Sequence, residues 1–162
     1  MDTRHIEIER FDESIDRIRA AFPWLGVELV RAHPDIHASA ELPRQAGLGF
    51  DVGINLQNAD ELHLTVGEHF WVEWFPCGEQ KVFEEFVAAV LGVISGEFRI
   101  VERYVLGRAV SAQLQRPDGA GGWRGVASWA NLRCLLPWPR TTRILRNDQN
   151  RAPSEIRHVR GV

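Results

Sequence analysis

The sequence is poor in lysine and cysteine. Among its 162 residues, Lys81 is the single lysine, and Cys77 and Cys134 are the only cysteines. Two cysteines so far apart provide neither a zinc-binding spacing nor a disulfide framework, which excludes the small disulfide-rich and zinc-finger classes. We therefore expect a reducing, cytoplasmic environment. The preference for arginine over lysine is typical of a GC-rich bacterial genome.

Long hydrophobic runs are also missing. No uninterrupted apolar run approaches the roughly 18 to 20 residues that a membrane-spanning helix requires. The first seven residues alternate charged and apolar side chains, which is not the pattern of a secretory signal. Hydrophobic residues make up 44% and charged residues 25% of the chain, both close to globular averages. We expect residues 1–146 to form a single soluble domain without membrane contact.

The charge is distributed unevenly along the chain. Residues 1–132 carry 12 basic and 20 acidic side chains, a net charge of −8, and residues 133–162 carry seven arginines against two acidic residues, a net charge of +5. We expect the polar, arginine-rich residues 147–162 to form a flexible tail, which either lies against the acidic body or extends into solvent. A nucleic-acid partner is disfavoured, because the acidic folded part repels phosphates.

Two segments show helical periodicity. Apolar residues follow one stripe over residues 11–22 and a broader stripe over residues 79–95, after which Gly96 is a natural C-terminal cap. The first stripe consists of Phe11, Ile15, Ile18 and Phe22. We predict an amphipathic helix over each segment.

The remaining periodicity indicates strands. Residues 48–57 alternate five apolar with five polar or small residues, and short turns separate them from alternating residues 61–66 and 69–75. Further strands are predicted at residues 24–33, 98–106, 108–116, 123–132 and 141–145, with a loop at 34–47. Short turns favour antiparallel pairing. The prediction is an α+β fold with an antiparallel sheet of about six to eight strands in two meanders, and two amphipathic helices packed on one face.

The alternation also predicts what the opposite face of the sheet presents. It mixes aromatic, amide, imidazole and carboxylate side chains without a lysine, a combination typical of binding surfaces. The predicted binding residues are Trp71, Glu73, His69, His63, Asp51, Asn55 and Trp129. Thr65, Phe75, Ser111, Gln113, Gln115 and Trp123 are expected beside them. A second interpretation is structural: Trp71 and Phe75 pack under the tail or the 34–47 loop, and Glu73 pairs with an arginine.

No catalytic motif is present. The glycine-rich residues 119–122 lack the lysine and hydroxyl residue of a phosphate-binding loop, and there is no nucleophile elbow or dinucleotide fingerprint. We therefore expect no cofactor. The favoured hypothesis is a non-enzymatic protein-interaction domain, such as an immunity-type inhibitor, a chaperone-like partner or an adaptor, which binds a protein partner or a second copy of itself.

The alternative hypothesis is a small enzyme or small-ligand-binding domain. It requires His63, His69 and Glu73 to converge, since two imidazoles and a carboxylate can bind a metal or transfer protons. His33 and His37 form a weaker metal pattern, because Pro34 disfavours the helix that would align them. Cys77 precedes the second helix, whose N-terminus would favour a reactive thiolate; an inert cysteine near a helix cap is the other interpretation.

Overall fold

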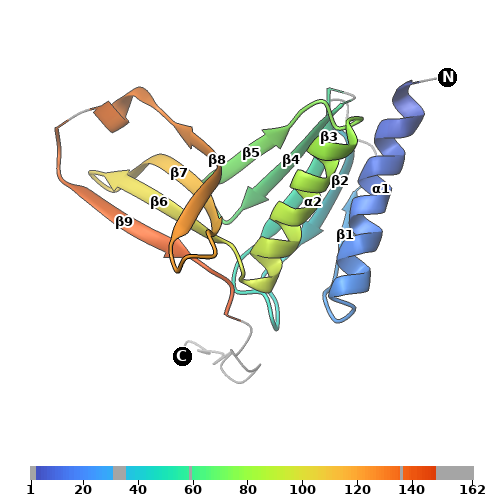
Figure 1. The fold of residues 1–162 in the computed structure, drawn as a ribbon, viewed down its shortest axis with the longest axis horizontal. Helices are drawn as coiled ribbons and strands as arrows, with labels where there is room; N and C mark the ends of the chain where they lie inside the picture. The colour runs from blue at the N-terminus through green and yellow to red at the C-terminus, as the bar shows by residue number, and fades with distance from the viewer. Residues whose placement is uncertain (1–2, 31–35, 59, 136, 149–162) are drawn as a thin grey trace, which may run out of the picture.

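The computed structural model describes residues 3–30, 36–58, 60–135 and 137–148, which form two antiparallel sheets and two long helices (Figure 1). In chain order the elements are α1 (Thr3–Ala21), β1 (Glu28–Val30), β2 (Ile36–Leu42), β3 (Val52–Gln57), β4 (Glu61–Val66), β5 (Phe70–Trp74), α2 (Gln80–Ser95), β6 (Arg99–Val105), β7 (Arg108–Pro117), β8 (Trp123–Ala130), the short 3₁₀ helix η1 (Leu132–Leu135) and β9 (Arg140–Leu145).

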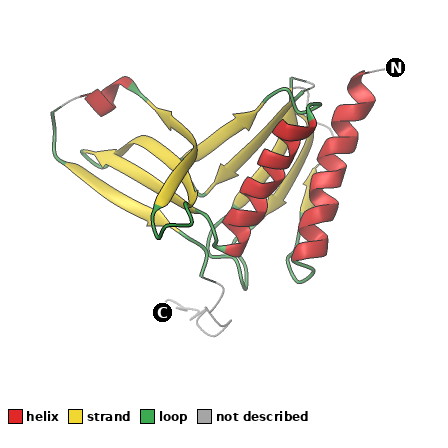
Figure 2. Cartoon of the chain, viewed as in Figure 1, coloured by secondary structure: helices red, strands yellow, loops and turns green. Residues whose placement is uncertain are grey.

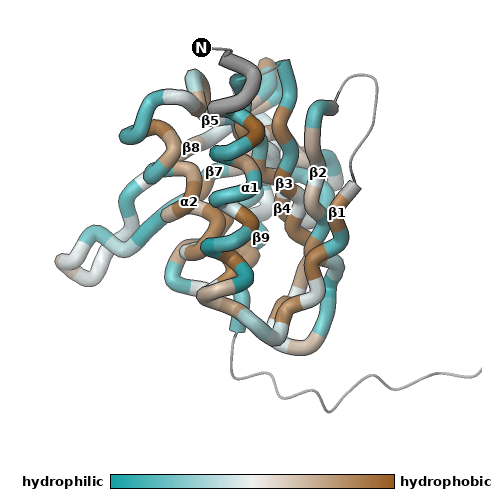
Figure 3. The backbone as a smooth tube through the Cα atoms, turned by 90° about the vertical axis from the view of Figure 1, so that its right-hand side faces the viewer, coloured by the Kyte–Doolittle hydropathy of each residue, from teal (hydrophilic) through white to brown (hydrophobic). Residues whose placement is uncertain are grey.

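The first sheet has the order β1-β2-β3-β4-β5, and both long helices lie side by side on one of its faces (Figure 2). The alternating apolar residues of β3, β4 and β5 point to these helices. Ile54 pairs with Leu64, and Leu64 pairs with Val72, so one row of buried side chains crosses three strands. Burial of this row and of its neighbours contributes to the hydrophobic core. Brown, hydrophobic segments run through α2 and the neighbouring strands in Figure 3.

The helix α2 confirms the predicted stripe and its end. Phe83, Phe86 and Val90 are buried on the side that faces the sheet. Gly96 follows the helix with φ 75° and donates its N–H to the Val93 carbonyl, a conformation that glycine adopts without steric cost. Among the described residues, neither helix is both long enough and apolar enough to cross a membrane.

The second sheet has the order β8-β7-β6-β9. The α+β class and the antiparallel pairing are therefore confirmed, but the nine described strands form two sheets, not one sheet of six to eight. Strand β9 pairs with β6 on the side away from β7, and β5 and β8 are edge strands of their sheets that lie next to each other. The indole N–H of Trp129 in β8 donates to the His69 carbonyl beside β5, at 2.8 Å.

Several predicted boundaries were wrong. The strand predicted at 48–57 begins at Val52, and within the described residues the strand predicted at 24–33 is limited to Glu28–Val30. The segment 34–47 was predicted as a loop, yet it contains β2, in which Ala38, Ala40 and Leu42 alternate toward the core and pair with β3. Because Ala38 and Ala40 are small, their alternation gives only a weak hydrophobic pattern, and a strand was not predicted here. The first helix begins at Thr3, not at residue 11.

The chain after β9 is anchored before it leaves the described residues. Asn147, placed at the start of the expected tail, is 5% exposed. Its amide bonds backbone groups of Gly47, Gly49 and Ile94, and Arg146 donates to the Gly96 carbonyl. Residues 149–162 lie outside the described part, so the expected flexibility of the tail stays a prediction.

Candidate functional site

The face of the first sheet opposite the helices presents polar and aromatic side chains, which we call the outer face. Strand register sets them in rows. One row runs from Glu28 through Glu41, Gly53 and Thr65 to Trp71; the next joins Ser39, Asn55, His63 and Glu73; a third joins Gln57 and Glu61. None of these residues is arginine or lysine. This acidic face thus contains four of the seven predicted binding residues: Asn55, His63, Trp71 and Glu73.

Two aromatic residues stand free of the core at the edge of the outer face. Trp71 is 52% exposed and Phe75 is 59% exposed. Glu73, between them in sequence, has no hydrogen-bond or ion-pair partner among the described residues. Within the described chain, therefore, neither the predicted second minor core nor the arginine partner of Glu73 is present.

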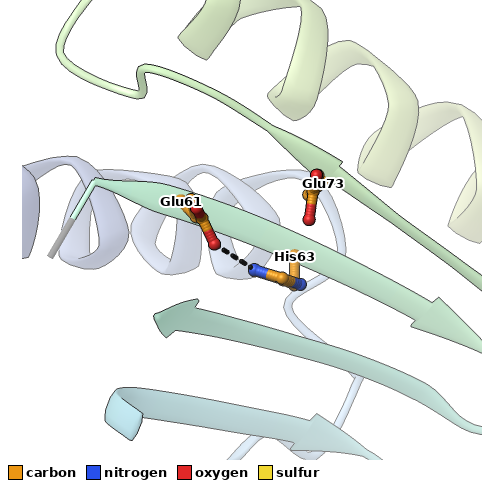
Figure 4. Close-up of side chains that lie close together, drawn as sticks. All are labelled: Glu61, His63 and Glu73. Carbon is orange, nitrogen blue, oxygen red and sulfur yellow. Dashed lines mark hydrogen bonds and ion pairs between the residues drawn. The ribbon is translucent and has the colours of Figure 1, made fainter. Parts of the chain in front are cut away.

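A cluster of possible ligand atoms lies where β4 begins and β5 ends. Glu61 and His63 are two residues apart on β4, and Glu73 pairs directly with His63 across the strands (Figure 4). One ligand atom from each of the three side chains lies within 4.8 Å of the others. The His63 Nε2 atom is 3.3 Å from Glu61 Oε2, which also accepts a hydrogen bond of 2.7 Å from the Asn58 amide. The cluster offers one nitrogen and two carboxylates.

The Glu41 carboxyl of the outer face lies close to two other acidic side chains. Burial raises the pKa of Glu41, and the nearby Asp51 and Glu28 carboxylates raise it further, against a hydrogen bond from Ser39 that lowers it. Like charges disfavour ionisation in this way when no cation is close. A positively charged ligand or partner would relieve this repulsion.

The other three predicted binding residues lie outside the rows of the outer face and contact other parts of the chain. Asp51 lies just before β3 and accepts the Arg44 backbone N–H at 2.6 Å. His69 lies at the boundary between the sheets, where its ring meets Tyr104 edge-on at 5.6 Å. Trp129 is half-buried and bonds the His69 carbonyl. The structure therefore brings Glu61 to His63 and Glu73, in the place that the sequence interpretation gave to His69.

A buried polar pair supports this boundary. Glu102 in β6 is 1% exposed, and its carboxylate accepts the Tyr104 hydroxyl at 2.7 Å. Burial, reinforced by this bond, raises the pKa of Tyr104. In the register of the sheet Glu102 lies opposite Arg143 of β9. A buried carboxylate is tolerated when it is hydrogen-bonded in this way.

Cys77 is buried in this fold, which disfavours its thiolate form. Its side chain is fully buried, and burial, assisted by the Glu7 and Asp60 carboxylates, raises the pKa of the thiol to about 11. The helix-terminus effect that would favour a thiolate is thus outweighed by desolvation. His33 lies outside the described residues, while His37 is exposed on β2.

We expect one fast and one slow thiol in a native titration with an aromatic disulfide at pH 8. At that pH a thiol of pKa about 11 is ionised to roughly one part in a thousand, against about a quarter for an ordinary cysteine. A Cys134→Ser variant should therefore react at least about a hundredfold more slowly than the wild type, and denaturation should restore one fast thiol. Fast labelling of the folded Cys134→Ser variant would contradict the burial of Cys77.

Folding raises the pKa of the Cys77 thiol to about 11. Any contribution of Cys77 to stability is therefore retained below about pH 8.5 and lost as the pH rises toward 11.

The larger hollows lie away from the outer face. One of about 660 Å³ lies between the C-terminal half of α2 and the β7–β8 loop, with Leu91, Ser95 and Arg116 in its wall. A second, of about 630 Å³, is lined by residues 130–135, and a smaller one of about 210 Å³ lies on the second sheet beside Trp129 and Arg103. None of these three walls contains a residue of the outer face.

Comparison of the chain with protein-family models, with curated proteins and with solved structures gave no match. Glu61 was not among the predicted site residues, although the period of two along 61–66 places it on the same side of the strand as His63.

Proposed function

We propose that this protein is an interaction domain that binds a protein partner through the outer face of its five-stranded sheet. The observation that carries the proposal is Trp71, half-exposed on a sheet face that no described helix covers. Tryptophan is the residue most enriched among those that dominate binding energy at interfaces. Phe75 and the unpartnered Glu73 beside it supply apolar contact and charge.

The chemistry of the outer face indicates what the partner presents. The described rows of this face combine Glu28, Glu41, Glu61 and Glu73 with no arginine or lysine. A complementary surface carries arginine or lysine residues around an apolar hollow that accepts an indole ring. An immunity-type inhibitor of a basic protein has this character, and so does a chaperone-like partner or adaptor for a basic client.

The first test measures binding with Trp71→Ala. We expect the affinity for a partner captured by the full chain to fall by roughly thirtyfold, equivalent to about 2 kcal/mol, because an interfacial anchor is removed. The melting temperature should stay within about 2 °C of the wild type, since the side chain is half-exposed and contributes little to the core. Binding is measured by surface plasmon resonance and folding by circular dichroism.

The matched control is Trp138→Ala. Trp138 is 46% exposed and lies outside the first sheet, between η1 and β9, so its loss should leave the affinity unchanged. Equal weakening by both variants, or unfolding of Trp71→Ala, would reject the outer face as the binding surface. Light scattering of the free protein distinguishes a second copy from a different partner, because only self-association raises the mass of the pure chain.

The competing proposal is a small enzyme or small-ligand-binding domain. The sequence predicted His63, His69 and Glu73 for its site, but the His69 ring lies against Tyr104. The support for this proposal is the cluster of Glu61, His63 and Glu73. The hollows named above do not contain Glu61, His63 or Glu73, which favours the interaction domain, because ligand sites are usually concave.

A further inference from the structure

We propose that Glu61, His63 and Glu73 form a binding site for a divalent transition-metal ion, with zinc as the preferred occupant. Their positions follow from the strand geometry and the pairing of β4 with β5. Residues i and i+2 of a strand share a face, and the residue opposite in an antiparallel neighbour lies about 5 Å away. Glu61 and His63 satisfy the first relation, and His63 and Glu73 satisfy the second. Three donors thus converge on a rigid framework of two adjacent strands.

The spacing of the donors matches metal coordination. A tetrahedral zinc ion with ligand bonds of about 2.0–2.1 Å holds neighbouring donors roughly 3.3–3.4 Å apart. The His63 Nε2 atom and Glu61 Oε2 are already 3.3 Å apart. Glu73 lies within the 4.8 Å limit of the cluster, so a side-chain adjustment of about 1.5 Å at most brings its carboxylate to coordination distance.

The charge of the cluster also favours a cation. Glu73 has no hydrogen-bond or ion-pair partner among the described residues, and the rows of the outer face contain no arginine or lysine. Glu61 receives a hydrogen bond from the Asn58 amide, which orients the carboxylate as an outer partner of a metal ligand does. The side chains of His63 and Glu61 are 12% and 24% exposed, so these two donors are partly shielded from water, while Glu73 is open to solvent.

The donor set selects the class of metal. Calcium and magnesium prefer six or more oxygen ligands, whereas an imidazole nitrogen with two carboxylates suits zinc and its transition-metal neighbours. Three protein ligands leave at least one coordination position, which a water molecule or a group of a bound partner can occupy. The inference does not depend on the proposed protein partner, and it is tested without one.

The experiment is a calorimetric titration of the full chain with zinc chloride, after removal of metal with a chelator and desalting. We expect one ion per chain, and a cobalt(II) titration should give the intense visible absorption of a four-coordinate site. His63→Gln should weaken zinc binding at least about a hundredfold, because it removes a direct ligand. Glu73→Gln, at an exposed position, should weaken it similarly and keeps the test valid if the histidine variant unfolds.

The matched controls are His69→Gln and Glu68→Gln. They change the same residue types beside β5 but outside the cluster, and should leave both the stoichiometry and the affinity unchanged. Zinc binding that persists in His63→Gln and Glu73→Gln, or that His69→Gln removes equally, would overturn the site. So would the absence of saturable binding to the wild type. Because no partner protein enters these titrations, their outcome is separate from that of the Trp71→Ala binding test.

Discussion

Replacing Asn147 with alanine is expected to lower the free energy of unfolding by about 3 kcal/mol. The Asn147 Oδ1 atom accepts the Gly49 N–H at 3.0 Å, and its amide nitrogen donates to the carbonyls of Gly47 and Ile94 at 2.7 and 2.6 Å. The side chain is 5% exposed, so water cannot readily replace these bonds. Buried backbone groups that lose their partner cost about 1–3 kcal/mol each, and partial access at the glycines reduces the sum.

The loss of stability should extend beyond the substituted position, because Asn147 connects segments that are distant in the sequence. It follows β9, and it ties the loop before β3 to the carbonyl end of α2. Urea denaturation followed by circular dichroism measures the change. Asn55→Ala is the matched control. Asn55 lies on the outer face, where, among the described residues, its side chain bonds only the Gln57 amide, and its loss should cost less than about 1 kcal/mol. Equal effects of the two variants would show that Asn147 does not anchor the chain.

Leu64→Ala is expected to destabilise the fold by about 3–4 kcal/mol. Leu64 is fully buried in the middle of the first sheet, paired with Ile54 and Val72 on either side. Truncation removes buried methyl groups and leaves a cavity, because the flanking strands are held by their ladders and cannot close it. Thermal and urea unfolding measure the loss, which at this size lowers the melting temperature by several degrees.

The matched control for Leu64 is Leu132→Ala. Leu132 is 84% exposed at the start of η1, and the same substitution there should change stability by less than about 0.5 kcal/mol. A small effect at Leu64 would mean that the helices do not cover this face of the sheet. That outcome would also reverse the assignment of the outer face, since His63 and Leu64 are adjacent and point to opposite sides.

The faces of the first sheet could be predicted because alternation is a local property. Val52, Ile54, Leu62 and Leu64 were assigned to the helix-covered side from the period of two alone, and all are buried. The same pattern placed His63, Trp71 and Glu73 opposite. The helix α2 and its Gly96 cap were predictable for a similar reason, since both depend on neighbouring residues of the chain.

Other features were not predictable because they depend on contacts between distant residues. The strand β2 was missed because Ala38 and Ala40 bury too little apolar surface to mark a strand, and pairing with β3 provides what the local signal lacks. Asn147 was assigned to the tail because a polar residue in a polar segment gives no sign that the ends of two other elements will meet it.

The sequence alone was enough to predict the α+β class and the alternation that places Asn55, His63, Trp71 and Glu73 opposite the helices. The tertiary structure was needed to show that the strands divide into two sheets, that His69 belongs to the boundary between them, and that Glu61, His63 and Glu73 converge. The physical reason is the range of the interactions. Side-chain direction follows from the backbone of the residue itself, whereas strand order and register are selected by the combined packing of the whole chain.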